Sequence, residues 1–420
     1  MKMGEFSEKV NISVDTIRYY ISLGLLVPEQ RDSKRYTFTD KDVSDAEEIL
    51  RLKELRFSIK EMQTLMRLKR TSSANEPMFA MKTSAVYKDK KNALQKELRQ
   101  IKKAIIEIDE KIESYKNIPA MSNAPEIGVP LRALPILKCP NCGKMLQITQ
   151  ATFSGNYVME GCLSCDCGFY ATIENGVIIT GNEYTAPYDT PDIDRNLYGT
   201  LCDGVFYQYQ QCSKHIMNGL LQLNLKNKVV LEGNINGYFF LYKNFENLPK
   251  DCLFIVVDKF KETLFMYKRL LESMNVDRDI LFIADASAAY PIEKGCVDVL
   301  VNFFGTNEWM LYHENTYEED IDPYLSDKCA IVGSFISLPQ NAITIVNTKK
   351  KYTEASSRMF SFSKYKNTLS KLGFTCETTK SGEVTHTQNS FAFTCHVEGE
   401  PYIYNKLVAK RSQQTHTASF

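Results

Sequence analysis

Residues 78–117 contain neither glycine nor proline, and apolar side chains recur through their second half at alternating steps of four and three. The repeating positions are Leu94, Leu98, Ile101, Ile105, Ile108, Ile112 and Tyr115. This heptad pattern, flanked by lysine, aspartate and glutamate, predicts one long helix with a continuous apolar stripe. The stripe is covered either by the helix's own domain or by a second copy of the chain.

The predicted helix lies at the end of a basic N-terminal region, called here the front region, and the rest of the chain is acidic. Residues 1–117 carry 24 basic and 19 acidic side chains, and the remainder carries 27 basic and 32 acidic ones, so the whole chain is neutral. This asymmetry indicates an anionic partner for the front region alone.

Apolar runs and cysteine usage predict a cytosolic protein. No run reaches the roughly 18–20 apolar residues that a membrane span needs, and the start lacks the pattern of a secretory signal. Of the twelve cysteines, four or five cluster and the others are scattered through apolar segments. That distribution is typical of a reducing compartment with one metal site.

Residues 4–36 predict two short helices followed by a hairpin wing with a basic tip. Ser13 is a good N-cap for the second helix, "VDTIRYYISLGLL", and Gly24 suits its end. Ile17 and Ile21 face inward in this arrangement. The side chains left partly or wholly outside are Thr16, Arg18, Tyr19 and Tyr20. By itself this pattern fits either a helix-turn-helix or a small helical domain with a solvated basic face.

The first 70 residues resemble the MerR family of bacterial transcription regulators, through "TIRYY", "GLL", "RY", "TDKDV" and "ILRLKELRFSIKEM". The resemblance implies that the second helix enters the major groove of DNA and that the wing grips phosphates. The DNA-contacting residues it implies are Ser13, Thr16, Arg18, Tyr19, Tyr20, Arg35 and Tyr36. Two features depart from the family: Ser33-Lys34 replaces a Tyr-Arg pair, and Arg56 replaces a glycine.

The same resemblance implies how the long helix is covered. It favours an antiparallel coiled coil that joins two subunits into a homodimer. Such a dimer presents two reading heads to a pseudo-palindromic operator in double-stranded DNA, at a promoter where RNA polymerase also binds.

Five cysteines between residues 137 and 168 predict a zinc ribbon. The first metal knuckle is "CPNCG" (residues 139–143), and the second lies in "CLSCDCG" (residues 162–168), where three cysteines compete for two places. The last two cysteines resemble the first knuckle because a glycine follows them directly. The expected ligands are Cys139, Cys142, Cys165 and Cys167, with Cys162 spare. A closed site of four thiolates is structural, and reversible redox or metal sensing is the alternative.

Apolar strands alternate with helices from about residue 190 to the end. Strands are expected within residues 228–242, 252–260, 279–291, 296–305 and 329–336, the first followed by a turn and a helix, and residues 368–374 form a helix before the final strands. This alternation predicts a parallel sheet with helices on both faces.

This region resembles class I S-adenosylmethionine-dependent methyltransferases, which have a Rossmann-like α/β fold. The resemblance implies that Asp258 binds the ribose hydroxyls, that Asp285 lies beside the adenine, and that Gly233 and Gly237 belong to the glycine-rich loop. Ile235 replaces the central glycine of that loop, so its side chain fills space that the ligand needs. No acid or base that could activate an acceptor is evident in "VNFFGTNEW", so no catalytic residue is assigned.

The expected chain is therefore multidomain. The predicted parts are a winged helix-turn-helix (1–77), a dimerisation helix (78–118), a proline-rich linker (119–136), a zinc ribbon (137–182) and a methyltransferase-like domain (183–420). We expect a dimeric regulator whose last domain senses a small-molecule effector, with S-adenosylmethionine or another nucleoside as candidates. The alternatives are a DNA-tethered methyltransferase and a regulator whose last domain only provides an assembly surface.

Overall fold

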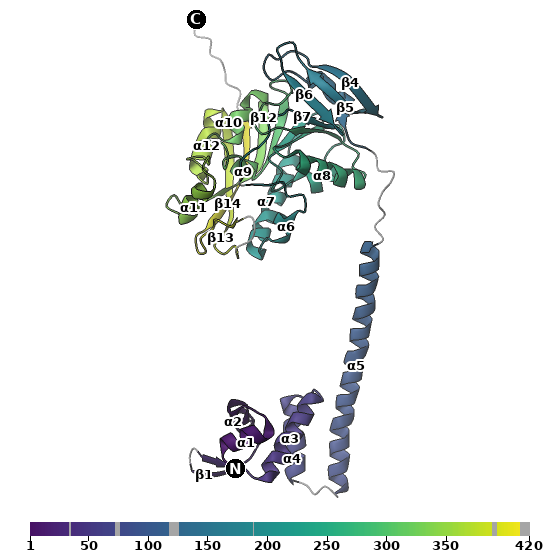
Figure 1. Ribbon diagram of the computed structural model, residues 1–420, viewed down its shortest axis with the longest axis vertical. Helices are drawn as coiled ribbons and strands as arrows, with labels where there is room; N and C mark the ends of the chain where they lie inside the picture. Colours follow the sequence, from purple (N-terminus) through teal and green to yellow (C-terminus); the bar gives the residue numbers. More distant parts are fainter. Residues whose placement is uncertain (33–34, 72–75, 117–125, 188, 389–392, 412–420) are drawn as a thin grey trace. The chain divides into compact units, whose positions relative to one another are not determined.

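The computed structural model describes residues 1–32, 35–71, 76–116, 126–187, 189–388 and 393–411, and it divides into two compact units, Met1–Pro119 and Ala120–Phe420. Each unit is described by itself (Figure 1). The expected wing-tip residues Ser33 and Lys34, residues 117–118 of the expected dimerisation helix and residues 119–125 of the expected linker lie outside the described residues. No helix in the described part of the chain combines the length and apolarity that a membrane crossing requires.

The first unit begins with the predicted winged helix-turn-helix. Its elements are α1 (Met3–Val10), α2 (Val14–Ser22), β1 (Glu29–Asp32), β2 (Arg35–Thr37), α3 (Asp40–Glu54) and α4 (Ile59–Thr71). Phe6 and Phe38 stack at 4.0 Å between ring centroids, in a core that also buries Ile17 and Leu25. Strands β1 and β2 pair antiparallel as the wing. The backbone of Arg56 is left-handed (φ 62°), so the end of α3 keeps a conformation that glycine adopts more readily.

Helix α5 (Pro77–Lys116) confirms the predicted long helix. Its first turns pack on the head, where the rings of Phe57 and Tyr87 lie 5.1 Å apart and Lys90 pairs with Glu61 at 3.0 Å. Beyond them, the predicted stripe is open to solvent within this one chain. Its members from Leu98 onward are 45% to 72% exposed: Leu98, Ile101, Ile105, Ile108, Ile112 and Tyr115.

The second unit is built on one twelve-stranded mixed sheet. The order along its main path is β13-β14-β12-β11-β8-β9-β10-β7-β6-β5-β3, with β4 paired to β5. The α/β strands are β8 (Val229–Gly233), β9 (Leu253–Asp258), β10 (Asp279–Ala284), β11 (Val297–Phe303), β12 (Leu325–Ser337), β13 (Phe374–Val384) and β14 (Tyr402–Arg411). Strands β8 to β12 are parallel to their neighbours among themselves, and β14 runs antiparallel between β12 and β13.

Helices cover both faces of this sheet, as predicted. The longer ones are α7 (Asp203–Leu221), α8 (Lys261–Ser273), α11 (Ile343–Lys351) and α12 (Phe362–Lys371), and the short ones are α6 (Asn196–Gly199), α9 (Gly305–Trp309) and α10 (Tyr317–Ile321). Alternate residues of β9 enter two cores: Phe254 and Val256 pack with α7 and α8, whereas Ile255 and Val257 pack with α10 and α12.

Between β8 and β9, where the structure describes every residue, the chain forms no α-helix, contrary to the prediction. The chain forms two 3-10 turns instead, η2 (Leu241–Lys243) and η3 (Phe245–Asn247). The cause is the buried carboxylate of Glu232, which accepts hydrogen bonds from the backbone amides of Phe240 and Leu241 at 2.7 and 2.9 Å and so folds the segment back onto the strand. Another 3-10 turn of this unit, η4, spans Asp322–Tyr324.

The cysteine-rich segment belongs to this sheet. Its strands are β3 (Val129–Pro130), β4 (Gln147–Ser154), β5 (Tyr157–Ser164), β6 (Tyr170–Glu174) and β7 (Val177–Ile179). Strands β6 and β7 form the predicted hairpin with left-handed Asn175 and Gly176 in its turn, and β7 pairs parallel to β10. Residues 126–136, expected as linker, instead form β3 and the 3-10 turn η1 (Leu131–Ile136), because Ile127, Val129 and Ala133 are buried.

Candidate functional sites

The outer face of α2 carries three of the residues expected to contact DNA. The Ser13 hydroxyl caps the helix by accepting a hydrogen bond from the backbone amide of Thr16 at 3.2 Å. Arg18 is exposed and pairs with exposed Asp15 at 3.3 Å, a solvated contact that a phosphate can replace. Tyr19 is 53% exposed. These side chains provide a cation and hydroxyl donors at the start of a helix, which are groups that bind phosphates and base edges.

Tyr20 does not lie on this face as expected. Its side chain is only 4% exposed and belongs to the core of the head, because it shares the inward side of α2 with Ile17. Tyr36 is half-buried and packs against the same core from β2. For Arg35 the structure describes the backbone, which begins β2.

A buried carboxylate that the sequence analysis did not single out fixes the head behind this face. Asp45 of α3 accepts hydrogen bonds from Lys69 at 2.9 Å and from Arg70 at 2.9 Å, both on α4. Arg70 also donates to the backbone oxygens of Gly24 and Leu25, just after α2. Burial raises the pKa of Asp45, but the two cations outweigh it and the pKa is lowered. The network thus ties α4 to the end of the candidate recognition helix.

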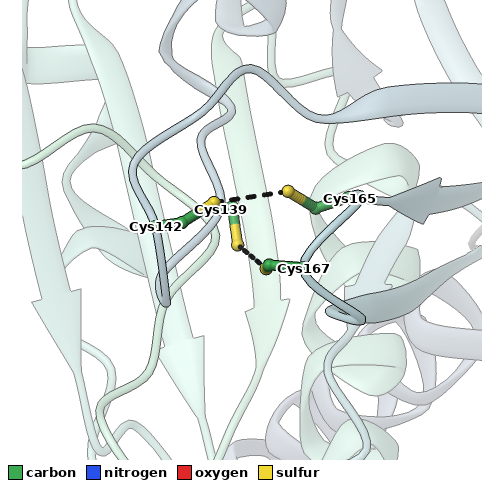
Figure 2. Close-up of side chains that lie close together, drawn as sticks. All are labelled: Cys139, Cys142, Cys165 and Cys167. Carbon is green, nitrogen blue, oxygen red and sulfur yellow. Dashed lines mark hydrogen bonds between the residues drawn. The ribbon is translucent and has the colours of Figure 1, made fainter.

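Four of the five clustered cysteines converge on one point (Figure 2). The Sγ atoms of Cys139, Cys142, Cys165 and Cys167 all lie within 4.8 Å of one another. Cys139 and Cys167 are 3.3 Å apart, and Cys142 and Cys165 are 3.4 Å apart. Cys162 lies apart from the cluster and accepts a hydrogen bond from the Tyr170 hydroxyl at 3.2 Å. The structure therefore brings together the four expected ligands and separates the expected spare.

Matching turns place the two cysteine pairs. Gly143 donates its amide to the Cys139 oxygen and Gly168 donates to the Cys165 oxygen, each at 2.9 Å, and both glycines have left-handed backbones. The amide of Phe169 lowers the pKa of the Cys167 thiol to about 7, whereas the pKa of Cys165 is raised to about 12, because the backbone amide of Cys167, which lowers it, is outweighed by the neighbouring thiols, chiefly that of Cys142, together with desolvation. Tetrahedral zinc with Zn–S bonds of about 2.3 Å needs sulfurs about 3.8 Å apart, so the cluster fits that ion.

The two aspartates expected to bind a nucleoside are buried and already accept hydrogen bonds within the protein. Asp258, at the end of β9, accepts hydrogen bonds from the amides of Asn236 at 2.8 Å and Phe260 at 2.9 Å, and burial raises its pKa to about 7. Asp285, after β10, accepts from Thr180, Asn182, Ser287 and Ala289 at 2.6 to 3.2 Å. Both carboxylates are therefore structural anchors in this conformation.

The glycine-rich loop does not form a cradle for a cofactor. Ile235 is completely buried, and a Cβ on Gly233 would overlap the hydroxyl of Tyr317. Gly237 lies beside the Glu308 carboxylate. Because Ile235, Asp258 and Asp285 are buried and Gly233 and Gly237 are closely contacted, the residues expected to hold the ribose and the methionine part do not fit S-adenosylmethionine in this conformation.

A buried group of charged side chains, which the sequence analysis did not identify, lies at the carboxyl edge of the sheet. Lys259 pairs with Glu308 at 2.5 Å and with Asp189 at 3.1 Å, and its side chain is almost wholly buried. The Asp189 carboxylate also accepts a hydrogen bond from the Tyr312 hydroxyl at 2.8 Å. Only the position of Lys259 directly after Asp258 could have suggested the group, since its other members come from distant segments.

The segment that carries Asp189 crosses the carboxyl edge of the sheet. The side-chain amide of Asn236 donates to the oxygen of Thr190, and the Asn236 oxygen accepts from the amide of Asp192 at 2.9 Å. On one side of this crossing lies a cavity of about 450 Å³, lined by residues that follow β8, β11 and β12. A second cavity, of about 440 Å³, is lined by residues at the carboxyl ends of β7, β9 and β10, among them Lys259, Phe260 and Ala284.

Comparisons with known proteins identify the family of the N-terminal part of the chain. Residues 1–69 match the model of the family described as MerR HTH family regulatory protein. The chain is 33% identical over 106 residues to heavy metal-dependent transcription regulator 2 of Rhizobium meliloti (strain 1021), in a match that spans 24% of this chain and 72% of that protein.

Solved structures similar to the chain include HiNmlR, a MerR family regulator lacking the sensor domain, bound to promoter DNA (21% identity, TM-score 0.22, 29% of this chain and 95% of that one). They also include phosphoethanolamine N-methyltransferase 2 of Haemonchus contortus in complex with S-adenosyl-L-methionine (11% identity, TM-score 0.35, 55% of this chain and 61% of that one).

Proposed function

Because the chain belongs to the MerR HTH family of regulatory proteins, we propose that it is a homodimeric transcription regulator. It binds a pseudo-palindromic promoter operator and responds to a ligand or signal received by its second unit. The observation that carries the proposal is the capped helix α2, whose outer face presents Thr16, Arg18 and Tyr19 on a rigid head. RNA polymerase at the same promoter is the partner through which such a protein changes transcription.

The exposed stripe of α5 supports the dimer. Six large apolar side chains at heptad spacing are open to water in the single chain, and a soluble helix rarely leaves a row of this length uncovered. An antiparallel copy of the same helix covers it by knobs-into-holes packing. Two-fold pairing of this kind gives two heads and hence a two-fold operator.

The cysteine cluster supports a structural zinc ion in the second unit. The ion would be held by Cys139, Cys142, Cys165 and Cys167 and would tie the turn before β4 to the turn after β5. A second candidate role is metal sensing, which the exposure of Cys142 and Cys167 favours because it leaves one side of the site accessible. The engaged aspartates and the buried loop argue against methyl transfer in either case.

Selection of duplexes from random DNA by the full-length protein tests the proposal. We expect enrichment of an inverted repeat bound by one dimer. Arg18→Ala should weaken binding and reduce the slope of log affinity against log salt by about one for each Arg18 in the complex, because each removes a phosphate contact.

Lys294→Ala is the matched control, since it removes an exposed cation of the other compact unit. Enrichment of single, unrepeated sites would contradict the dimer, and an unchanged salt slope in Arg18→Ala would contradict the assignment of α2. DNA binding that is lost on removal of the metal and regained with a different metal would favour sensing over a structural ion.

A further inference from the structure

One acidic side chain lies on the face of α2 that the proposed function assigns to DNA. The exposed residues of this helix follow one another at steps of three, one and three, so they form a single stripe: Asp15, Arg18, Tyr19 and Ser22. Asp15 is the sole acidic residue of α2, and its side chain is 92% exposed. The head therefore presents a carboxylate to a polyanion.

Asp15 lies in the first turn of α2, ahead of Arg18 and Tyr19. The helix begins at Val14 and is capped by Ser13, so Asp15 is close to its N-terminal end. Recognition helices of helix-turn-helix proteins contact base edges through their N-terminal residues. The carboxylate thus belongs to the part of the helix that reads bases.

A stabilising role within the helix does not account for a carboxylate at this position. Asp15 interacts favourably with the helix dipole and with exposed Arg18, but both effects are small at solvated sites. A negative charge beside the phosphates of a duplex, in contrast, weakens binding to every sequence. Such a charge favours binding only where it accepts a hydrogen bond from a base.

Arg18 can hold this carboxylate and bind a phosphate at the same time. Its Nη1 atom donates to Oδ1 of Asp15 at 3.3 Å. A guanidinium presents several N–H donors in a rigid fork, so others remain for a phosphate. Among the described residues no donor contacts Oδ2 of Asp15. Arg18 therefore orients the carboxylate, reduces its repulsion from the DNA backbone and leaves one oxygen for a base.

Cytosine is the base that suits this oxygen best. In the major groove cytosine presents its N4 amino donor and adenine its N6 donor, whereas guanine and thymine present acceptors. The N6 donor of adenine lies beside the N7 acceptor of the same base, which repels a carboxylate. An acidic side chain in this groove therefore discriminates in favour of cytosine.

We propose that Asp15 is a specificity-determining residue, which accepts a hydrogen bond from the N4 amino group of one cytosine in each half-site of the operator. The inference rests on the proposed function and deepens it, because it assigns one base of the DNA partner. Arg18 is both a phosphate contact and the positioning residue for this carboxylate. Because a homodimer carries two copies of Asp15, the two cytosines occupy symmetric positions of the inverted repeat.

Selection from random duplexes by the full-length protein and two variants of Asp15 tests the assignment. The normal chain should select cytosine at one symmetric pair of positions. Asp15→Ala should select no base at that pair and keep the rest of the operator, and Asp15→Asn should shift the preference towards adenine, because an amide pairs with its N6 and N7 atoms. Cytosine selected equally by all three proteins would overturn the proposal.

Binding titrations on defined duplexes measure the same contact. Exchange of the selected cytosine for thymine in both half-sites should weaken binding of the normal chain by at least about tenfold, and that of Asp15→Ala by less than about twofold. An equal loss in the two proteins would show that Asp15 does not read this base pair.

Glu47→Gln is the matched control for the loss of a negative charge. Glu47 is exposed on α3 of the same head, so this variant changes the charge and leaves α2 intact. It should discriminate between the two duplexes as strongly as the normal chain. Discrimination reduced to the same extent in Glu47→Gln and Asp15→Ala would indicate a general effect of charge and contradict a contact with the base.

The base assignment and the proposed function fail in different ways. If the normal chain enriches no duplex at all, the proposed function is wrong. If it enriches an inverted repeat whose base preferences are the same in Asp15→Ala and Asp15→Asn, the assignment of Asp15 is wrong and operator binding stands. A preference for cytosine that disappears in both variants supports the two together.

Discussion

The carboxylate of Asp258 accepts a hydrogen bond of 2.8 Å from the backbone amide of Asn236, so the loop after β8 is tied directly to the end of β9. The second carboxylate oxygen accepts from Phe260 at 2.9 Å. Each oxygen keeps a second lone pair, but Asp258 is only 1% exposed. A nucleoside could therefore reach Asp258 only if the loop moved, and loss of the hydrogen bond from the Asn236 amide would cost roughly 1–3 kcal/mol.

We therefore predict that the full-length protein does not bind S-adenosylmethionine at micromolar concentrations in calorimetry. Asp258→Ala should lower stability by about 1–3 kcal/mol, because two buried amides lose their acceptor. The midpoint of thermal unfolding measures that loss. Micromolar binding in the normal chain that disappears in a folded Asp258→Ala variant would show that the loop opens and would restore the methyltransferase hypothesis.

The stripe of α5 yields a prediction with an internal control. Ile105 and Ile106 are adjacent and similarly exposed, at 51% and 58%, but only Ile105 lies on the heptad stripe. Ile105→Asp should dissociate the dimer, since roughly 2–3 kcal/mol of apolar burial per chain is replaced by a buried charge. Ile106→Asp should remain dimeric. Light scattering measures the molecular mass of both variants. If both remain dimers, another surface joins the subunits.

Elements set by local sequence were predictable, and those set by distant pairing were not. Ser13, the heptad stripe and the glycines after each cysteine pair act on neighbouring residues, and the structure contains the corresponding cap, helix and turns. The pairing of β7 with β10 joins the cysteine-rich segment to the α/β sheet, and no local pattern encodes it.

The same distinction explains the errors in the candidate sites. The sequence predicts an outward-facing Tyr20 because Ile17 and Ile21 define the inward side of the helix, yet the ring of Tyr20 lies with Ile17 in the core. Asp258 and Asp285 are at the predicted strand ends, but the groups that engage Asp285 include Thr180 and Asn182, from a segment about a hundred residues earlier. The partners of a side chain follow from the fold, and composition alone does not reveal them.

The two cysteine pairs predict that substitution of Cys139, Cys162 or Cys165 affects metal content differently. Cys139→Ser and Cys165→Ser should each lose the metal, because each removes one of four converging sulfurs, whereas Cys162→Ser should keep one zinc per chain. Elemental analysis of purified protein measures the content. Zinc kept in Cys165→Ser and lost in Cys162→Ser would show that the second knuckle uses Cys162 in place of Cys165.

Asp45 predicts a pH-dependent contribution to the stability of the DNA-binding head. Lys69 and Arg70 hold its pKa below the usual value in the folded state, despite burial, so the folded head binds this proton less tightly than the unfolded chain. The contribution is therefore fully present above the unfolded pKa of about 4 and is lost as the pH falls through the lower folded value. Asp45→Asn should destabilise the head by about 1–3 kcal/mol at pH 7 and by progressively less below pH 4.

Hydrogen exchange of α3 and α4 peptides, corrected for the intrinsic pH dependence of exchange, reports this local stability in the full-length chain. Asp15→Asn is the matched control, because its ion pair with Arg18 is exposed to solvent and should contribute less than about 1 kcal/mol. The same network holds the oxygens of Gly24 and Leu25 through Arg70, so Asp45→Asn should also loosen the end of α2 and weaken operator binding at pH 7. Exchange in Asp45→Asn that matches the normal chain at pH 7 would show that the apolar core alone positions the recognition helix.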